Sequence, residues 1–407
     1  MHIALLHHTY PPVPGGVERV LQAHARLFAA AGHDVRVIAG FGTESVSGIR
    51  IECVPELLAD HPTTVAAREE VTAGPPGRWF KESIEGLRPA LHRLLAGCDA
   101  VFAHNLLTMP FHPAATAALA QIAAGGAGER WGGRFFHWLH DAAYANPDYR
   151  LPTPDRFPWD LMTRPLPGVR TIAVSEHRAR QWRGLAGPDA VSGVIPNGVD
   201  PAGFLVLPPA LADWCEGTRL FDRELVLLHP ARLVRRKNIE LSIRTTQAIG
   251  ELGCDALLIV TGAPDPHQSA GEAYANELAL GIGADAVAFP GGQFPIGEAE
   301  LSGLYRLADA LLFPSRSEGF GIPPLEAALY RLPMFLSRAA ALNELPFSNV
   351  TWFEPDIRPD QLAARILERM GGDSAHANRR RTLRDYRWSR IFERQVAPLL
   401  LAEPPAD

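Results

Sequence analysis

Short apolar runs, separated by polar segments and by glycine or proline, recur along the whole chain. Runs of this length between turn residues predict buried strands. Between them lie longer segments whose apolar residues recur at the spacing of an amphipathic helix. The alternation of strands and helices predicts an α/β fold. The predicted strands are residues 3–6, 35–38, 100–103, 135–139, 171–174, 225–229, 256–260, 287–289 and 310–314.

The predicted helices complete a series of strand–helix–strand units in each half of the chain. Residues 62–80, which include Gly74-Pro-Pro-Gly77, are predicted to form a long loop. Residues 201–222 lack clear periodicity and are predicted to link two domains. The predicted helices are residues 17–30, 83–95, 114–124, 238–251, 272–280, 298–307, 325–330 and about 360–370, and a final amphipathic stretch covers about 388–401.

Length and composition narrow the class of protein. A chain of 407 residues is too long for one hydrophobic core and fits two α/β domains. The net charge of −6 argues against a surface that binds nucleic acid. We expect no transmembrane segment, because no apolar run is long enough, and no signal peptide, because the first strand follows without a basic leader. The four cysteines are widely scattered, so we expect neither a zinc site nor disulfides, and we predict a cytoplasmic location.

The stretch Glu318-Gly-Phe-Gly-Ile-Pro-Pro-Leu-Glu326 lies between the predicted strand 310–314 and a helix. Its glycines, Gly319 and Gly321, allow the backbone to come close to a ligand. Its two prolines suit the first turn of a helix, where a missing N–H group costs little. Because free N–H groups at the start of a helix bind anions, this stretch predicts a phosphate-binding turn.

The two glutamates of this stretch do not form a hydrolytic pair. On one helix, residues at this spacing would lie about 12 Å apart, whereas the carboxyl groups of glycosidases lie roughly 5 to 9.5 Å apart. We expect Glu318 in the turn, at one end of a long ligand, and Glu326 one helical turn in, at the other end. A solvated loop glutamate and a helix-surface glutamate are the alternative.

Other polar residues follow predicted strands at their carboxyl ends, where ligands of open α/β sheets bind. The glycine loop after the first strand either contacts a phosphate or simply makes a turn. The histidine after strand 135–139 either contacts substrate or satisfies local backbone groups. These residues are Gly15 and Gly16, His104 and Asn105, and His140 and Asp141.

Two cations lie in the loop after strand 225–229. Arginine binds phosphate through two parallel hydrogen bonds, and lysine supplies a point charge. Next to the helix start near Ile322, Arg232 and Lys237 could together hold a diphosphate without a metal ion. Arg235 and Arg236 lie between them and could be solvated. The chain contains no Asp-x-Asp motif that would clamp a metal-bound diphosphate.

Together these motifs resemble those of the retaining glycosyltransferases of family 4, also called glycosyl transferases group 1, which have the GT-B fold. The resemblance implies two Rossmann-like domains that face a cleft, with a C-terminal helix that crosses back to the N-terminal domain. We therefore expect an acceptor domain at residues 1–205 plus about 388–407, and a nucleotide-sugar donor domain at residues 206–387. The motifs that carry the resemblance, spread over nearly the whole chain, are Pro14-Gly-Gly-Val-Glu18, His140-Asp141, Ala173-Val-Ser-Glu176, Pro196-Asn-Gly-Val-Asp200, Ala231-Arg-Leu-Val-Arg-Arg-Lys237, the stretch 318–326 and Tyr386-Arg-Trp-Ser389.

The resemblance also implies roles for single residues. Arg232 and Lys237 would hold the donor diphosphate, and Glu326 would bind the ribose hydroxyls. A backbone N–H group at Gly16 would reach the phosphates from the opposite domain, and His140 would lie by the anomeric centre and the primary hydroxyl of the sugar. The implied catalytic residues are His140, Arg232, Lys237 and Glu318. The implied donor-binding residues are Gly15, Gly16, Arg232, Lys237, Glu318, Gly319, Phe320, Gly321, Ile322 and Glu326. The residues expected on the acceptor side are His104, Asn105 and Asp141, and no metal ligand is expected.

The implied reaction is metal-independent transfer of a hexosyl unit from a nucleoside-diphosphate sugar to an acceptor hydroxyl, with retention of the anomeric configuration. The donor would be of the UDP-glucose, UDP-N-acetylglucosamine or GDP-mannose type, and no cofactor is expected. A front-face route, in which the leaving phosphate takes the acceptor proton, is what the family suggests. The acidic charge balance favours a small soluble acceptor over a lipid-linked one and leaves peripheral membrane contact open.

The sequence departs from the family pattern around the cation loop. Ala231 and Asn238 stand where the family often has glycine, although neither change removes a charge. Two alternative functions remain: a catalytically inactive protein that binds nucleotide sugars, and a nucleotide-sugar epimerase with the GT-B fold. A dinucleotide oxidoreductase is disfavoured, because no Gly-x-Gly-x-x-Gly motif follows the first strand.

Overall fold

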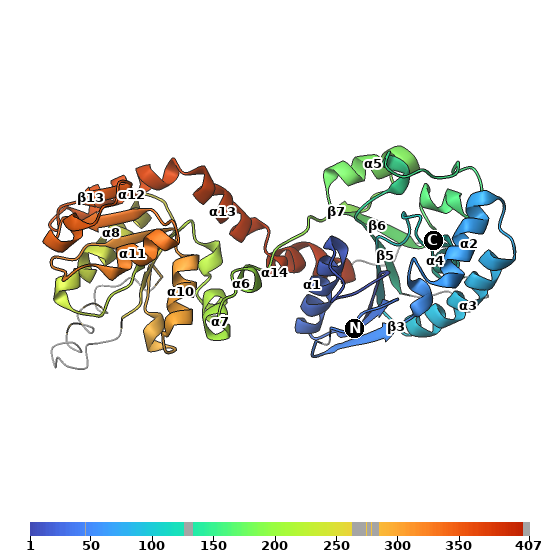
Figure 1. The fold of residues 1–407 in the computed structure, drawn as a ribbon, viewed down its shortest axis with the longest axis horizontal. Coiled ribbons are helices and arrows are strands. Elements are labelled where there is room, and N and C mark those ends of the chain that lie inside the picture. Colours follow the sequence, from blue (N-terminus) through green and yellow to red (C-terminus); the bar gives the residue numbers. More distant parts are fainter. Residues whose placement is uncertain (45, 126–132, 263–273, 275–277, 279–284, 402–407) are drawn as a thin grey trace. The chain divides into compact units, whose positions relative to one another are not determined.

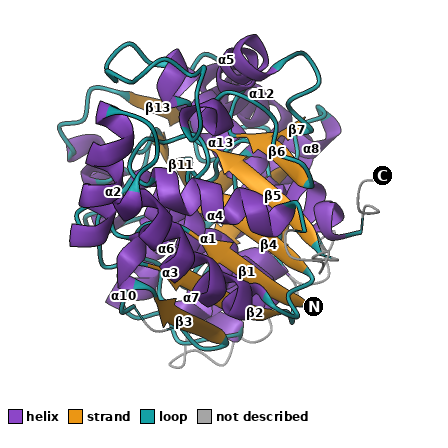
Figure 2. Ribbon diagram, turned by 90° about the vertical axis from the view of Figure 1, so that its right-hand side faces the viewer, coloured by secondary structure: helices purple, strands orange, loops and turns teal. Residues whose placement is uncertain are grey.

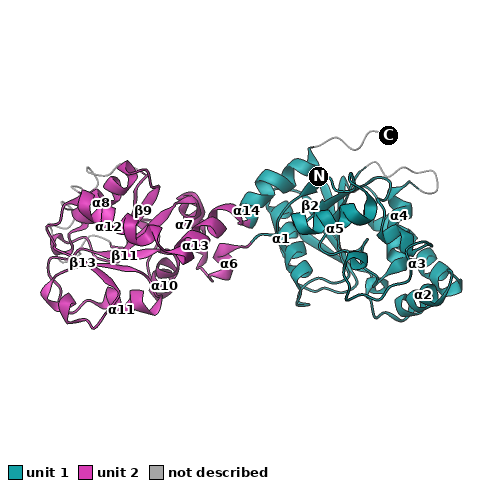
Figure 3. Cartoon of the chain, turned by 90° about the horizontal axis from the view of Figure 1, so that it is seen from above, with its two compact units in different colours: residues 1–198, 388–407 teal, residues 199–387 magenta. Residues whose placement is uncertain are grey.

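The chain folds into two compact units (Figure 1, Figure 3). The structure is a computed structural model, and it describes residues 1–44, 46–125, 133–262, 274, 278 and 285–401. Unit 1 contains Met1–Gly198 and the C-terminal segment from Trp388, and unit 2 contains Val199–Arg387. Each unit is built on a parallel sheet. The predicted α/β fold with two Rossmann-like domains is confirmed, and so is the return of the C-terminal segment to the first of them.

The sheet of unit 1 has the strand order β3-β2-β1-β4-β5-β6-β7, with every neighbouring pair parallel. Figure 2 shows β1, β4 and β5 side by side. The strand order reverses between β1 and β4, and in such sheets ligands bind outside the carboxyl ends of the strands at this point. The strands are β1 (His2–Leu6), β2 (Asp34–Ala39), β3 (Ile49–Cys53), β4 (Ala100–His104), β5 (Arg134–Leu139), β6 (Val169–Ala173) and β7 (Gly193–Val194). The helices are α1 (Gly16–Ala30), α2 (Pro62–Ala73), α3 (Arg78–Leu95), α4 (Pro113–Ala123), α5 (Glu176–Ala186) and α14 (Trp388–Ile391).

Alternate strand residues of unit 1 pack into two separate cores. Leu6 shares one core with residues of α2, α3 and α4. Leu5 shares the other with α1 and the C-terminal segment. In that second core Phe392 packs edge-on against Phe28 of α1, with 5.0 Å between the ring centroids. Apolar burial therefore holds the C-terminal segment on unit 1.

The sheet of unit 2 is also parallel, with the order β10-β9-β8-β11-β12-β13. Its strands are β8 (Leu225–His229), β9 (Ala256–Val260), β10 (Val287–Ala288), β11 (Ala310–Phe313), β12 (Met334–Ser337) and β13 (Val350–Phe353). Its helices are α6 (Pro201–Phe204), α7 (Pro209–Gly217), α8 (Ile239–Glu251), α10 (Glu298–Leu307), α11 (Ile322–Leu329), α12 (Pro359–Gly371) and α13 (Ser374–Asp385).

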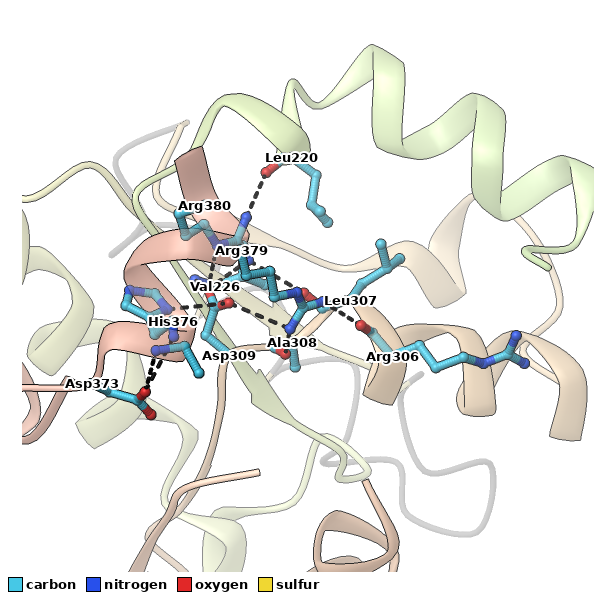
Figure 4. Close-up of polar contacts among 11 residues, drawn as sticks. Leu220, Val226, Arg306, Leu307, Ala308, Asp309, Asp373, His376, Arg379 and Arg380 are labelled. Carbon is cyan, nitrogen blue, oxygen red and sulfur yellow. Dashed lines mark hydrogen bonds and ion pairs between the residues drawn. The ribbon is translucent and has the colours of Figure 1, made fainter. Parts of the chain in front are cut away.

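Helix α13 is attached to the sheet of unit 2 largely by charged groups (Figure 4). The buried Asp309 carboxylate precedes β11, and its Oδ2 accepts hydrogen bonds of 2.7 Å from the Val226 N–H and from Arg380 Nε. His376 and Arg379 of the same helix approach Oδ1 at 3.4 and 3.5 Å. Burial alone would raise the pKa of Asp309, but these basic partners lower it, so the group stays a carboxylate.

Two predicted segments were wrong. The long loop expected at residues 62–80 is mostly helix α2, in which Thr64, Ala67 and Val71 are buried at helical spacing. The linker expected at residues 201–222 instead forms α6, α7 and a short turn of helix, and Trp214 belongs to the core of unit 2.

The boundary between the two units lies at Gly198–Val199, before the position 205–206 expected from the sequence. It lies earlier because the segment that was expected to be a linker folds as part of unit 2. The Val199 N–H donates to the Tyr386 carbonyl at 2.8 Å, so this connection is already part of unit 2. Helix α13 was not predicted, and the helix predicted at 272–280 lies largely outside the described residues.

Candidate functional site

In unit 2 a turn joins β11 to α11, and it requires a glycine directly before the helix. Gly321 has φ of +99°, a conformation that residues with a side chain rarely adopt. A Cβ atom at this position would also lie only 2.4 Å from Leu342 Cδ2. The flanking Phe320 and Ile322 are 56% and 61% exposed. The turn is therefore tightly packed on one side and open to a ligand on the other.

A lysine–glutamate ion pair occupies the start of this turn. Lys237 Nζ lies 2.5 Å from Glu318 Oε1, and both side chains are largely buried. Arg236 Nη1 lies 3.4 Å from the second carboxylate oxygen and donates to the Ser317 carbonyl at 3.1 Å. Burial lowers the pKa of Lys237, while its hydrogen bond to Glu318 opposes that shift. The structure thus places the Glu318 carboxylate on Lys237, where phosphate was expected, and on Arg236, which was expected to be solvated.

Two residues beside the cation loop, Asn238 and Gly262, hold its backbone in place. Asn238 has φ of +55°, in the left-handed region that asparagine tolerates better than most residues. Its Nδ2 donates to the carbonyls of Pro314 and Pro355 at 3.2 and 3.1 Å, which ties the cation loop to the turn after β11. Gly262 packs against the loop so closely that a Cβ atom there would lie 2.0 Å from the Ala231 carbonyl oxygen. Position 262 therefore has no room for a side chain next to the loop that carries Arg232.

Glu326 lies on α11 and is held by a tyrosine. The Tyr305 hydroxyl donates a hydrogen bond of 2.6 Å to Glu326 Oε2. The Tyr305 ring stacks on Tyr330, with ring centroids 5.6 Å apart. Burial and the nearby Glu326 both raise the pKa of Tyr305, so the phenol stays protonated as a donor. Glu326 is thereby fixed one helical turn into α11.

Arg232 is exposed in the loop that follows β8. It is close enough to Lys237 to help lower the pKa of that lysine. Among the described residues, no group of three or more histidine, cysteine, aspartate or glutamate side chains is arranged to hold a metal ion. The metal-independent donor site expected from the sequence remains a prediction.

In unit 1 the glycine loop leads directly into α1. Gly15 is the N-cap residue, and the side chain of Glu18 folds back over it, so that a Cβ atom at Gly15 would lie 1.9 Å from Glu18 Oε2. Glu18 accepts a hydrogen bond of 2.6 Å from Thr9 and lies 3.7 Å from His7 Nε2. Burial alone would raise the pKa of Glu18, but the hydrogen bonds from His7 and Thr9 lower it to about 2. Gly16 is exposed, with open space beside its Cα.

His140 lies at the carboxyl end of β5 against a second histidine. Its Nε2 is 3.3 Å from Nδ1 of His104, which is fully buried at the end of β4. Burial, assisted by neighbouring histidines, lowers the pKa of His140 to about 3 and that of His104 well below its usual value. Both rings are therefore neutral near pH 7. His104 lies behind His140 in the protein interior and is placed to support its ring.

Asp141 and Asn105 connect the loops that follow β5 and β4. Asn105 Oδ1 accepts a hydrogen bond of 2.8 Å from the Asp141 N–H. The Asp141 carboxylate pairs with Arg178 of α5 at 2.9 Å. Asp141 therefore links the loop after β5 to α5.

The predicted site residues divide between the units. Gly15, Gly16, His104, Asn105, His140 and Asp141 lie in unit 1, and Arg232, Lys237, residues 318–322 and Glu326 lie in unit 2. Sequence reasoning missed the contacts made by Glu18, Arg236 and Tyr305. Glu18 and Arg236 belong to motifs already singled out, whereas nothing in the sequence marks Tyr305 as the partner of Glu326.

Each of the two units matches a protein-family model. Residues 14–202 match the family model described as Glycosyltransferase Family 4, and residues 213–385 match the model described as Glycosyl transferases group 1. The chain belongs to this glycosyltransferase family. Its two Rossmann-like units, with the C-terminal segment returned to the first, have the GT-B arrangement of elements.

Individual relatives of this glycosyltransferase are distant. It is 30% identical over 236 residues to the D-inositol 3-phosphate glycosyltransferase of Actinosynnema mirum, a match that covers 54% of this chain and 53% of that protein. It is 26% identical over 178 residues to a GDP-mannose-dependent alpha-(1-6)-phosphatidylinositol dimannoside mannosyltransferase of Mycobacterium tuberculosis, with 43% and 44% covered. The chain spans about half the length of these curated relatives in the matched regions.

A solved structure of low sequence identity also aligns with the glycosyltransferase. Sucrose-phosphate synthase from Thermosynechococcus elongatus is 20% identical and has a TM-score of 0.39, with 98% of this chain and 99% of that chain covered. Within the described part of the chain, no helix is both long enough and apolar enough to cross a membrane.

Proposed function

We propose that this glycosyltransferase moves a hexosyl unit from a nucleoside-diphosphate sugar to an acceptor hydroxyl, with retention of configuration and without a metal ion. The observation that carries the proposal is the Glu318 carboxylate held by Lys237 and Arg236 beside the start of α11. Cations that hold a carboxylate can also bind phosphate oxygens in its place. Arg232, Lys237 and the N–H groups of the turn would hold the diphosphate.

Donor binding would exchange partners at this ion pair. Lys237 would turn from Glu318 to the diphosphate, and Glu318 would become available to accept hydrogen bonds from the sugar hydroxyls. Glu326, fixed by Tyr305, would bind the ribose. The name of the mycobacterial relative makes GDP-mannose one donor to test, beside UDP-glucose and UDP-N-acetylglucosamine.

The chemical step would break the bond between the anomeric carbon and the phosphate oxygen and form a bond to the acceptor oxygen. The acceptor proton would pass to the leaving phosphate on the same face of the sugar. Arg232 and Lys237 would stabilise the charge that grows on the leaving diphosphate. His140, kept neutral by burial, would act as a hydrogen-bonding group toward the primary hydroxyl of the sugar without adding charge.

Removing either cation tests this proposal. Loss of one group that stabilises transition-state charge costs about 2.7–4 kcal/mol in other enzymes. We expect Arg232→Ala and Lys237→Ala to lower turnover at least about a hundredfold on that basis. Turnover is measured as release of nucleoside diphosphate from the donor with acceptor present.

Arg381→Ala is the matched control, because Arg381 is an exposed arginine of the same unit on α13. Turnover near the wild-type value in Arg232→Ala or Lys237→Ala would refute the assigned roles. The same assay separates a transferase from an epimerase or an inactive binding protein, because only a transferase releases the diphosphate in proportion to added acceptor.

A further inference from the structure

Unit 1 contains a pocket of about 790 Å³ that none of the predicted site residues lines. One wall is helix α2, and the other walls come from the loops after β4 and β5. The lining residues used in the argument below are Val65, Arg68, Phe111, Tyr149, Leu151 and Trp159. The volume is within the range of small-molecule binding sites.

The pocket is built from the same two loops that carry the candidate site of unit 1. The segment between β4 and α4 includes Asn105 and Phe111, and the segment between β5 and β6 includes His140 and Leu151. Thr108 joins them: its hydroxyl donates to the Asp141 carbonyl at 2.6 Å, and its own carbonyl accepts from the Ala143 N–H at 3.1 Å. A molecule seated in the pocket would therefore lie against the loop that begins at His140.

A series of contacts between aromatic rings connects the pocket to the surroundings of His140. Phe111 packs against Tyr149 on the pocket side, with ring centroids 6.2 Å apart, and against His8 on the other, at 5.9 Å. His8 in turn contacts His7, whose Nδ1 lies 2.7 Å from the His104 carbonyl oxygen. The pocket and His140 thus belong to one packed assembly within unit 1.

The inner surface of the pocket is mostly apolar, and Arg68 is its charged member. The Trp159 N–H donates to the Val71 carbonyl at 2.9 Å, so the nitrogen of this buried indole is already paired. Arg68 Nη1 donates hydrogen bonds to the carbonyls of Ala59 and Phe111, both at 2.9 Å. These bonds hold α2 against the segments that contain the two carbonyls. Val65, Phe111 and Leu151 are half-buried, which leaves part of each side chain for a ligand.

The mouth of the pocket carries more negative than positive charge. Asp60, Glu69 and Asp148 are exposed lining residues, against one exposed arginine, Arg150. With the half-buried Arg68 included, three carboxylates and two guanidinium groups line the pocket. A phosphate placed here would still meet an excess of negative charge, and like charges close together are unfavourable. Hydroxyl groups, by contrast, would find carboxylate acceptors at the mouth and an apolar surface below it.

We propose that this pocket binds the acceptor, and that the acceptor is an uncharged, hydroxyl-bearing molecule with an apolar ring or body. The apolar body lies against Val65, Phe111 and Leu151, and the hydroxyls lie toward the mouth. This assignment rests on the transferase function proposed above for the whole chain. It differs from an inositol phosphate or a phospholipid headgroup, the acceptor chemistry that the names of the relatives suggest.

Binding of defined probes to the full chain tests the assignment by calorimetry. The probes are 4-nitrophenyl β-D-glucopyranoside, free glucose and myo-inositol 1-phosphate. The nitrophenyl glucoside is expected to bind at least about tenfold more tightly than either of the others, since only its nitrophenyl ring can be buried against the apolar wall. Tighter binding of inositol phosphate, or no binding of the glucoside, would overturn the proposal.

Two variants locate the binding. Val65→Trp fills the pocket from α2, and Leu151→Asp places a charge on its wall from a loop. Each is expected to weaken binding of the glucoside at least about tenfold. Glu85→Trp, an exposed position on α3 outside the pocket, is the control and is expected to bind like the wild type. Unchanged binding in both pocket variants would overturn the proposal.

Nucleotide binding is measured in parallel on all four proteins. Nucleotide binding that stays unchanged while glucoside binding is lost supports an acceptor pocket in a working transferase. If the wild type binds no nucleotide, the proposed function of unit 2 is refuted, whether or not the pocket binds the glucoside.

Discussion

The two units differ in the ionisable groups that they bury beside their candidate sites. In unit 1 several buried groups are imidazoles whose pKa values burial lowers, so they carry no charge near pH 7, and Glu18 is a charged exception. In unit 2 burial lowers the pKa of His229 in the same way, but charged groups are also buried in pairs, as in the pair of Lys237 with Glu318 and the pair of Arg380 with Asp309. Under the proposed function, the paired charges of unit 2 would exchange partners with a diphosphate, and the neutral imidazoles of unit 1 would form hydrogen bonds without adding charge.

The two kinds of buried group also make the stability of the units depend on different conditions. Neutral buried imidazoles make a unit sensitive to protonation, because the unfolded chain takes up protons that the folded chain cannot. Buried ion pairs make a unit sensitive to loss of one partner, because the other charge is left unpaired. The predictions below test each sensitivity in turn, from the largest expected effect to the smallest.

Acid is expected to destabilise unit 1 more than unit 2. Burial lowers the pKa of His8, His24, His137 and His140 to about 3 from a usual value of 6.5. These folded pKa values lie below the unfolded ones, so stability is fully present above pH 6.5 and is lost as the pH falls toward 3. Each histidine contributes up to about 1.4 kcal/mol per pH unit in this window. Because the pKa of Asp309 is lowered from its usual value of 3.8, the ion network around this carboxylate in unit 2 stays charged at pH values where the histidines of unit 1 already favour unfolding.

Hydrogen exchange at pH 7 and pH 5, corrected for the intrinsic rate, checks this difference. Peptides from β4 and β5 should lose much more protection than peptides from β11 and β12, which do not contain the buried His229 of β8. A His24→Phe variant should reduce the pH dependence, because His24 is buried among aromatic rings and neither ring nitrogen has a hydrogen-bond partner in the structure. Equal loss of protection in both units would contradict the contrast.

Asp309→Ala is expected to destabilise unit 2 strongly. The change leaves Arg380 buried without its carboxylate, and breaking a buried pair in this way costs about 3–5 kcal/mol. The loss is measured as reduced protection from exchange in β8, β11 and α13. Asp385→Ala removes a carboxylate from the same helix at an exposed position and should leave the protection of unit 2 nearly unchanged. Equal effects of the two substitutions would show that the Asp309 network does not hold α13.

Ser175→Ala gives the smallest effect and tests a neutral hydrogen bond in unit 1. The Ser175 hydroxyl accepts from the Arg178 N–H at 3.2 Å and so caps α5. Loss of such a cap costs about 1 kcal/mol. The expected result is weaker protection at the start of α5 only, with Ser175→Thr retaining the cap. A loss as large as that of Asp309→Ala would mean that neutral contacts matter as much as buried charge.

Much of the fold could be predicted because the strands are short apolar runs. The exceptions have physical reasons. Helix α13 has the sequence SAHANRRRTLRD, and it is held by Asp309 through Arg379 and Arg380, which no hydrophobic periodicity reveals. Helix α2 begins with a proline and precedes a Gly-Pro-Pro-Gly turn, so its ends look like a loop. The segment taken as a linker is rich in proline, yet it carries Leu211 and Trp214 into a core.

The candidate site could be predicted as single residues but not as contacts. The glycine requirement at 321 and the position of Glu326 on a helix follow from local sequence. The contact of Lys237 with Glu318 and that of Tyr305 with Glu326 join distant parts of the chain. The pocket beside α2 could not be predicted, because the segment that forms its main wall had been assigned to a loop.

The most direct test of the central claim, that unit 2 is a donor site for a nucleoside-diphosphate sugar, is a thermal-shift panel without metal. The panel contains UDP, GDP and ADP with their glucose, mannose and N-acetylglucosamine conjugates. A ligand that binds only the folded state adds about 2.7 kcal/mol of stability at a hundredfold excess over its dissociation constant. The account predicts that one nucleotide raises the melting temperature, and that Lys237→Ala abolishes the shift while Arg381→Ala retains it. No shift with any nucleotide, or an undiminished shift in Lys237→Ala, would contradict it.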